Sequence, residues 1–347
     1  MKFVRLQLCA GVFAALLTTG SFAQVTQAQV NATDAPKEEK TFSAEHIGLG
    51  KELTVLSGLS EQYDAMIQSM AQSMAAEGRK NTEIIPHLND ILTMLKPELD
   101  ILKQQMVNKS GRIFADKIQE SDLKNIVAFF KSETGVLYVR KQSEVLAKLG
   151  PILRDWAGTT EEYLDLRMRA ELQKRDVIIQ IPRKNEQKPG DSAPNPAADT
   201  PQATEEQVKL ARKVAIDSGL TRSYDGLMTQ LVLGLRERMM KDPGFHTVSN
   251  SAEVLSDVIT SLQPEVDRLR GQIVDETAKV LAQNIPEDKM KEIDTFFNSE
   301  SGKVYVEQLP KIYDDLIPEM DAWLKKCIEY INTRTRGELA KRGYQFQ

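Results

Sequence analysis

Apolar side chains recur at spacings of three and four residues along most of the chain, which predicts amphipathic helices. One such face comprises Tyr63, Met66, Ile67, Met70 and Met74. A second has the same spacing and comprises Leu92, Leu95, Leu99, Leu102 and Met106. No segment shows the sustained alternation of apolar and polar residues that is typical of a strand. We therefore predict an all-α fold.

Residues that favour helix ends divide the first periodic segments. Gly58 predicts the end of one helix, and Ser60 predicts the N-terminal cap of the next. Thr221 is expected to cap the corresponding helix later in the chain. Ser121 is expected to cap a helix over 122–131. Pro97 is expected to start or kink a helix.

The last helical region of the first half is predicted to run from Gly135 to about Arg175, with an interruption near Gly150-Pro151.

The second half of the sequence resembles the first. FFKSETGVLYV at 129–139 returns as FFNSESGKVYV at 296–306, an offset of 167 residues that also relates Trp156 to Trp323. Identity is roughly a third from about residue 90 to residue 175, well above the level expected by chance. Upstream the offset is 161, so the second copy has six extra residues near 241–244, which predict a lengthened loop.

These patterns predict two tandem helical-bundle repeats of five or six helices each, at 43–178 and 205–343. Between them, residues 179–204 are rich in proline and polar residues and predict a linker. Residues 24–42 are expected to be a second disordered segment.

The N-terminus resembles an export signal. Lys2 and Arg5 precede an apolar stretch from Leu8 to Leu17, and small residues end at Ala23. We expect a signal peptide at 1–23, cleavage near Ala23 and a periplasmic or secreted protein. The apolar stretch is roughly ten residues, short of the about 20 that span a bilayer, although an uncleaved anchor stays an alternative. No other segment reaches membrane length, so the mature protein is not expected to be integral to the membrane.

Charge and composition exclude several classes of function. The formal net charge of −5 argues against a nucleic-acid binder. Two cysteines and three histidines in 347 residues predict neither a metal site nor a cofactor. After cleavage Cys327 is the one remaining cysteine; it shares a helical face with Trp323 and Tyr330 and is expected to be buried and inert, with a disulfide to a second copy as the alternative.

The turn after each aromatic pair resembles a known family, the bacterial secreted domain of unknown function twenty fifty-nine. Its pattern is an aromatic pair, a serine, a glycine and then a helix containing proline; the matching residues are Phe129, Phe130, Ser132 and Gly135, and Phe296, Phe297, Ser299 and Gly302. The family usually has proline where Glu133 and Glu300 stand. The resemblance implies export and a helical fold, and it supplies no catalytic residue.

This turn also has a physical interpretation of its own. The aromatic pair supplies a large buried surface, the serine caps, and the glycine lets the next helix begin close to its neighbour. We predict a structural role, with a backbone notch for a ligand group as the alternative.

Other candidate chemistry is weak. Ser121 and Lys124 have the spacing of a serine–lysine acyl enzyme, but Asp288 replaces the serine in the second copy, so a helix cap is favoured. Glu98 and Glu265 recur after prolines and are expected in the first turns of helices. A methionine stripe at 66, 70 and 74 corresponds to leucines in the second copy, which favours a core position over a client-binding face.

Clusters of basic residues close both final helical regions. They are Arg167, Arg169, Lys174 and Arg175, and Arg334, Arg336, Lys341 and Arg342. Cations there complement the carboxyl end of a helix. The functional alternative is contact with an anionic lipid or with lipopolysaccharide.

We therefore expect an exported, non-enzymatic helical protein that binds another protein or an envelope component. A periplasmic chaperone that binds clients and an envelope-polymer hydrolase that uses Glu or Asp remain alternatives. The ligand and the oligomeric state do not follow from the sequence.

Overall fold

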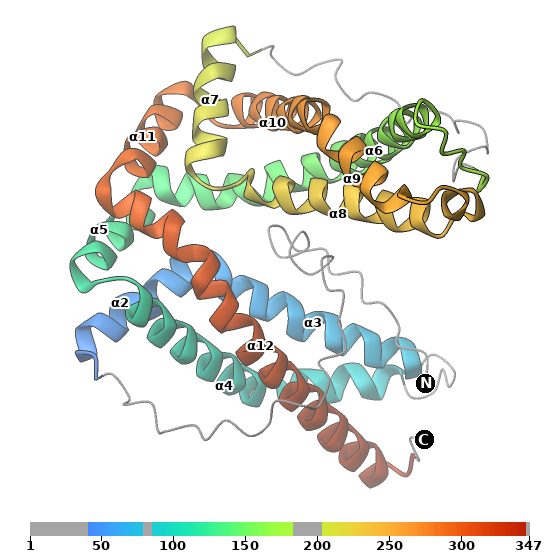
Figure 1. The fold of residues 1–347 in the computed structure, drawn as a ribbon. Helices are drawn as coiled ribbons and strands as arrows, with labels where there is room; N and C mark the ends of the chain where they lie inside the picture. The colour runs from blue at the N-terminus through green and yellow to red at the C-terminus, as the bar shows by residue number, and fades with distance from the viewer. Residues whose placement is uncertain (1–40, 79–84, 183–202, 345–347) are drawn as a thin grey trace. The chain divides into compact units, whose positions relative to one another are not determined.

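The computed structural model describes residues 41–78, 85–182 and 203–344, and the regular structure within them is entirely helical, which confirms the predicted all-α class. We call 41–182 the N-terminal half and 203–344 the C-terminal half. The N-terminal half contains α2 (Ala44–Leu56), α3 (Leu59–Gly78), α4 (Ile85–Lys117), α5 (Glu120–Lys131) and α6 (Glu133–Gln173). The C-terminal half contains α7 (Glu205–Asp217), α8 (Arg222–Met240), the 3-10 helix η1 (Pro243–Thr247), α9 (Ser251–Ser261), α10 (Gln263–Asn284), α11 (Glu287–Asn298) and α12 (Glu300–Lys341) (Figure 1).

Three sequence predictions fall outside these ranges. The predicted signal peptide, residues 24–40 of the segment after it, and residues 183–202 of the predicted linker lie outside the described residues. Within the described ranges, no helix combines the length and the apolar character needed to cross a membrane.

Local side chains and glycines set several helix ends. Ser43 accepts a hydrogen bond from the backbone N–H of His46 at the start of α2. Thr204 and Gln207 form a capping box at the start of α7. Gly58 and Gly219 follow α2 and α7 with φ angles of 80° and 76°, a conformation that costs other residues a steric penalty.

Two predicted caps are wrong by one or two residues. Helix α3 begins at Leu59, directly after the left-handed Gly58, so Ser60 lies inside the helix. Helix α5 begins at Glu120 with Gln119 in extended conformation before it, so Ser121 also lies inside the helix. Thr221 does precede α8, but its side chain makes no capping hydrogen bond.

The expected break near Gly150-Pro151 is also wrong, because α6 continues from Glu133 to Gln173. Proline removes one donor from the helix and frees the carbonyl four residues earlier. Pro151 and Ala147 are both exposed, so water can reach that carbonyl. At Pro97 the helix likewise continues, whereas in the C-terminal half α10 begins with Pro264 in its first turn.

The described residues form two compact units whose boundaries lie inside α6 and α11. Unit 1 contains residues 140–182 and 203–294, so it joins most of α6 to α7–α10. Unit 2 contains residues 41–78, 85–139 and 295–344, so it joins α2–α5 to α12. Each unit is therefore built from both halves of the chain. Unit 1 combines α6 of the N-terminal half with helices of the C-terminal half, and unit 2 combines α12 of the C-terminal half with helices of the N-terminal half.

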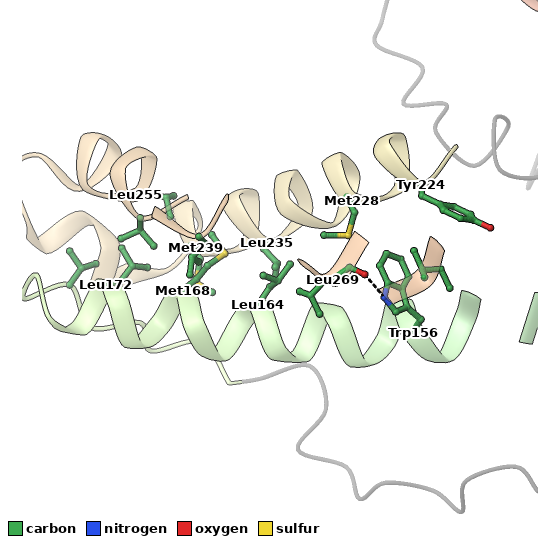
Figure 2. Packing of buried hydrophobic residues seen from close by; sticks show 14 of the residues in the cluster. Trp156, Leu164, Met168, Leu172, Tyr224, Met228, Leu235, Met239, Leu255 and Leu269 are labelled. Carbon is green, nitrogen blue, oxygen red and sulfur yellow. Dashed lines mark hydrogen bonds between the residues drawn. The ribbon is translucent and has the colours of Figure 1, made fainter. Parts of the chain in front are cut away.

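In unit 1, α6 packs on helices of the C-terminal half. Trp156, Leu164, Met168 and Leu172 lie along one face of α6 and point toward Met228, Leu235 and Met239 of α8 (Figure 2). The Trp156 indole N–H donates to the carbonyl of Leu269 in α10, at 3.2 Å. These side chains belong to one buried cluster, whose burial is the main source of stability in such a unit.

In unit 2, α12 packs on helices of the N-terminal half and lies along α4 (Figure 1). Buried residues of α12 include Trp323, Cys327, Ile331 and Leu339. The Trp323 indole N–H donates to the carbonyl of Leu102 in α4, at 2.8 Å, and its ring lies 5.6 Å from that of Tyr63.

Candidate functional site

The two turns between aromatic pair and glycine have the same capping geometry. Ser132 Oγ accepts a hydrogen bond from the N–H of Gly135 at 3.0 Å and donates to the carbonyl of Phe129 at 2.6 Å. Ser299 Oγ accepts from the N–H of Gly302 at 3.1 Å and donates to the carbonyl of Phe296 at 2.6 Å. Each serine thus closes one helix and caps the next.

The glycine of each turn allows a close backbone approach. A Cβ atom at Gly135 would lie 2.1 Å from the carbonyl oxygen of Phe129, and one at Gly302 would lie 2.0 Å from that of Phe296. Both contacts are far inside van der Waals distance. Any side chain at these positions would force the helices apart, as the predicted packing role requires; the notch for a ligand stays the alternative.

The structure brings the two aromatic pairs together in unit 2. The rings of Phe129 and Phe296 are stacked, with centroids 3.8 Å apart and an interplanar angle of 1°. Phe130 packs edge-on against Tyr305, and Phe297 packs edge-on against Tyr138. The turns themselves were predicted from sequence, but their mutual contact was not, because no spacing indicates which turn meets which.

Most of the predicted anion-binding residues donate hydrogen bonds to carboxylates of the protein. In unit 1 the guanidinium of Arg167 forms a bidentate contact with Glu265, and this contact lowers the pKa of the Glu265 carboxyl. In unit 2 Arg334 Nη2 lies 3.5 Å from Glu98 Oε1. Glu98 lies within α4 and not in the first turn of a helix, so that expectation is wrong, whereas Glu265 does lie in the first turn of α10.

The remaining members of the basic clusters are engaged in a similar way, apart from Arg336, which is exposed. The contacts are Arg169 to Asp165, Lys174 and Arg175 to Glu171, Lys341 to Glu338, and Arg342 to Asp90. Contact with an anionic lipid stays a prediction, which salt-dependent binding to anionic liposomes would test.

Unit 1 also contains a charge cluster that the sequence analysis did not identify. Asp165, with 6% of its side chain exposed, accepts from Arg169 at 2.7 Å and from Arg238 of α8 at 3.0 Å. Arg238 also donates to Glu161 at 3.1 Å. The spacing of four residues between Glu161, Asp165 and Arg169 was the available signal, but the partner on α8 lies 73 residues from Asp165.

Asp242 holds the segment after α6 against the C-terminal half. Its carboxylate is fully buried and accepts from the N–H groups of Gly244 at 2.7 Å and Ile181 at 2.5 Å. Burial alone would raise the pKa of Asp242, but the backbone donors, Gln180 among them, and the nearby Arg169 charge outweigh burial and lower it. The 3-10 helix η1 and this anchor lie at the place where the sequence comparison predicts a lengthened loop.

A hollow of about 340 Å³ lies beside this anchor and is lined by Arg169, Gln173 and residues 177–182. The structure shows no constellation of nucleophile and base there.

The other chemical candidates have structural surroundings. Ser121 is exposed, and Lys124 pairs with Glu120 and Glu45. His46 contacts the carbonyl of Ile118 through Nε2 at 2.9 Å. Among the described residues, no group of His, Cys, Asp and Glu side chains could hold a metal ion.

Cys327 is fully buried, and burial raises the pKa of its thiol to about 11. A thiol in this state is a poor nucleophile, which agrees with the expected inert role. Met66 and Met70 are also buried, as expected for core positions.

Comparison with known proteins now adds one result. Residues 271–329 match the family described as "Uncharacterized protein conserved in bacteria (DUF2059)". This match confirms the predicted family resemblance for the second of the two turns; for the first turn it stays a prediction. The DUF2059 segment extends from α10 through α11 into α12 and includes Phe296, Phe297, Ser299 and Gly302. No curated protein and no solved structure matches the chain.

Proposed function

We propose that the protein is an exported, tandemly duplicated helical protein that acts by binding a partner protein in the periplasm and not by catalysis. Export rests on the charged and apolar pattern of residues 1–23. The linker between the two copies is shorter than the predicted 179–204, because Ile181 is bound to Asp242 and Thr204 caps α7.

Equivalent contacts in the two units support the duplication. The offset of 167 relates the hydrogen bond from Trp156 to Leu269 in unit 1 to the one from Trp323 to Leu102 in unit 2. It also relates the ion pair of Arg167 and Glu265 to that of Arg334 and Glu98. Independent sequences would have no reason to repeat these partners at one spacing.

Binding of a partner protein rests on an exposed apolar stripe of α4. Met94 is 45% exposed and Ile101 is 60% exposed, and the exposed Pro97 lies between them on the same helical face. Exposed apolar side chains that share a face are a feature of contact sites, whereas isolated ones are ordinary. Unit 1 offers a comparison on α8, where the exposed Leu233 and Met240 have the same spacing. Glu98 and Glu237 stand at the same place in the two helices, but the exposed Arg236 stands on α8 where α4 has Pro97.

The experiment places a photo-crosslinking amino acid at 94 or at 101 of the exported protein in cells, with position 233 as the matched control. We expect a covalent adduct with a second protein from the α4 positions only. The adduct at 94 should disappear when Ile101 is changed to Lys, while circular dichroism of the purified chain stays unchanged. No adduct, or an equal adduct at 233, would contradict the proposal.

A further inference from the structure

We call α6 and α12 the exchanged helices, because each packs in the unit formed mainly by the other half of the chain. They carry their acidic contact residues at different positions. In unit 2, Lys117 and Lys109 of α4 pair with Asp315 and Glu319 of α12, the first at 2.7 Å. In unit 1, Arg238 of α8 pairs with Asp165 and Glu161 of α6. We call the remaining helices of each unit its body. In both units, basic residues of the body pair with acidic residues of the exchanged helix.

The equivalent positions of the other helix do not carry these acids. At the offset of 167, Asp315 and Glu319 of α12 correspond to Lys148 and Ile152 of α6. Glu161 and Asp165 of α6 correspond to Ile328 and Asn332 of α12. The offset also relates Lys109 of α4 to Glu276 of α10.

It would therefore be unfavourable for α6 to pack on the other helices of the N-terminal half, or for α12 to pack on those of the C-terminal half. If α6 took the place of α12, Lys148 would face Lys117. If α12 took the place of α6, Glu319 would face Glu276, and Arg238 would lose both carboxylates. Exposed pairs contribute little each, but an arginine left without its partners in a largely buried position is costly. Such repulsive alternatives are how related interfaces achieve selectivity.

We propose that the two halves of this chain are selective partners for each other, which associate through the exchanged helices without needing the linker and reject pairing with their own kind. The inference uses the positional correspondence of the duplication proposed above and is independent of the binding of another protein. The hydrogen bonds from Trp156 and Trp323 are common to both units, so they provide affinity but no selectivity. Selectivity comes from the charged positions.

The first experiment starts from the intact folded chain with a protease site inserted within 183–202. After cleavage, size-exclusion chromatography with native mass spectrometry should show one 1:1 complex of the two fragments. Separate fragments at micromolar concentration would overturn the proposal.

The second experiment tests selectivity. Two preparations of the cleaved chain carry different tags on the N-terminal fragment, inserted ahead of the protease site. They are mixed, partly unfolded in urea and refolded together. Purification through one tag should recover the C-terminal fragment and not the N-terminal fragment with the other tag. Recovery of both N-terminal fragments together would overturn the proposal.

The third experiment changes the discriminating carboxylate. Asp165→Asn introduces the residue type that stands at the equivalent position 332, and it should accelerate dissociation of the cleaved complex at least tenfold. Asp155→Asn is the matched control, because Asp155 is an exposed residue of the same helix, and it should change the rate less than twofold. Equal rates for the two variants would count against the proposal.

Should Asp165→Asn prevent folding of the intact chain, the pair of Lys117 and Asp315 provides a milder test. Because Lys117 also contacts Asp116 at 3.2 Å, the parent and both variants carry Asp116→Asn. In that background Asp315→Lys should accelerate dissociation, and the added change Lys117→Asp should restore the original rate. Failure of this rescue would contradict a role for charge.

Discussion

Unit 1 binds α6 and unit 2 binds α12 through the same kinds of hydrogen bond and ion pair, but the two helices differ in their other charged contacts. Both use a tryptophan indole that donates to a leucine carbonyl and an arginine that pairs with a glutamate. Next to these contacts, unit 1 has the cluster around Asp165 and Glu161, whereas α12 has Asn332 and Ile328 at the positions 167 residues further along the chain. The shared contacts set where a helix docks, and the differing ones set which helix docks.

The largest expected effect comes from the shared tryptophans. Trp156→Ala and Trp323→Ala should each lower the free energy of unfolding by about 4 kcal/mol, because each removes a large buried ring and a hydrogen bond. Urea unfolding followed by circular dichroism measures both. If one variant lost much less stability than the other, the two units would not be held alike.

The glycines of the two turns come next. Gly135→Ala and Gly302→Ala should each cost about 3 kcal/mol, because the new methyl group would overlap a carbonyl oxygen. Gly150→Ala is the matched control within α6, because a Cβ there meets no atom within 4 Å. It should stabilise the helix by about 0.5 to 1 kcal/mol. A tolerated alanine at 135 with lost binding of a partner would support the notch for a ligand instead.

Asp242 distinguishes unit 1 by its pH dependence. Because the pKa of Asp242 is lowered by folding, its ionised form contributes stability at pH values above its unfolded pKa near 3.8, and this contribution disappears as pH falls through the folded pKa. Asp242→Asn should cost about 2 kcal/mol at pH 7. The difference between parent and variant in urea unfolding should shrink at pH 3. A difference that stays constant with pH would contradict an ionised anchor.

The smallest expected effect concerns a buried hydroxyl pair in each unit. Tyr63 contacts Ser110 and Tyr224 contacts Thr277, both at 2.7 Å. Tyr63→Phe and Tyr224→Phe should each cost about 1 kcal/mol, since the ring stays and one hydrogen bond is lost. Similar losses in thermal unfolding are expected, and a loss confined to one variant would show that the pairs differ in energy.

Local features of the fold could be predicted from sequence, but the packing of α6 and α12 on helices of the opposite half of the chain could not. The capping by Ser132 and the close approach at Gly135 depend on residues within one turn, so their spacing was informative. The apolar faces carrying Trp156 and Trp323 are alike, so periodicity shows that each is buried but not against which half. The break expected at Pro151 failed because solvent can satisfy the carbonyl that the proline leaves free.

For the candidate site, too, residues could be predicted from the sequence but their distant partners could not. The basic clusters were visible in the sequence, but their acidic partners were not, because Arg167 and Glu265 lie 98 residues apart. Asp165 and Arg238 were missed for the same reason, since each alone resembles an ordinary surface charge.

The exchange of helices is tested most directly by thiol cross-linking. Gln105 of α4 and Lys326 of α12 lie within hydrogen-bonding distance, at 3.3 Å, and Thr159 of α6 lies 167 residues before Lys326. Cysteines are placed at 105 and 326, or at 105 and 159, in a chain with a protease site within 183–202, and a short thiol cross-linker is added before cleavage. The account predicts that the 105–326 pair joins the two fragments on a denaturing gel. For the 105–159 pair, both positions lie in the N-terminal fragment, and peptide mass spectrometry should find no link between them. Efficient reaction of 105 with 159, and none with 326, would show that each half folds on its own last helix and would contradict the account.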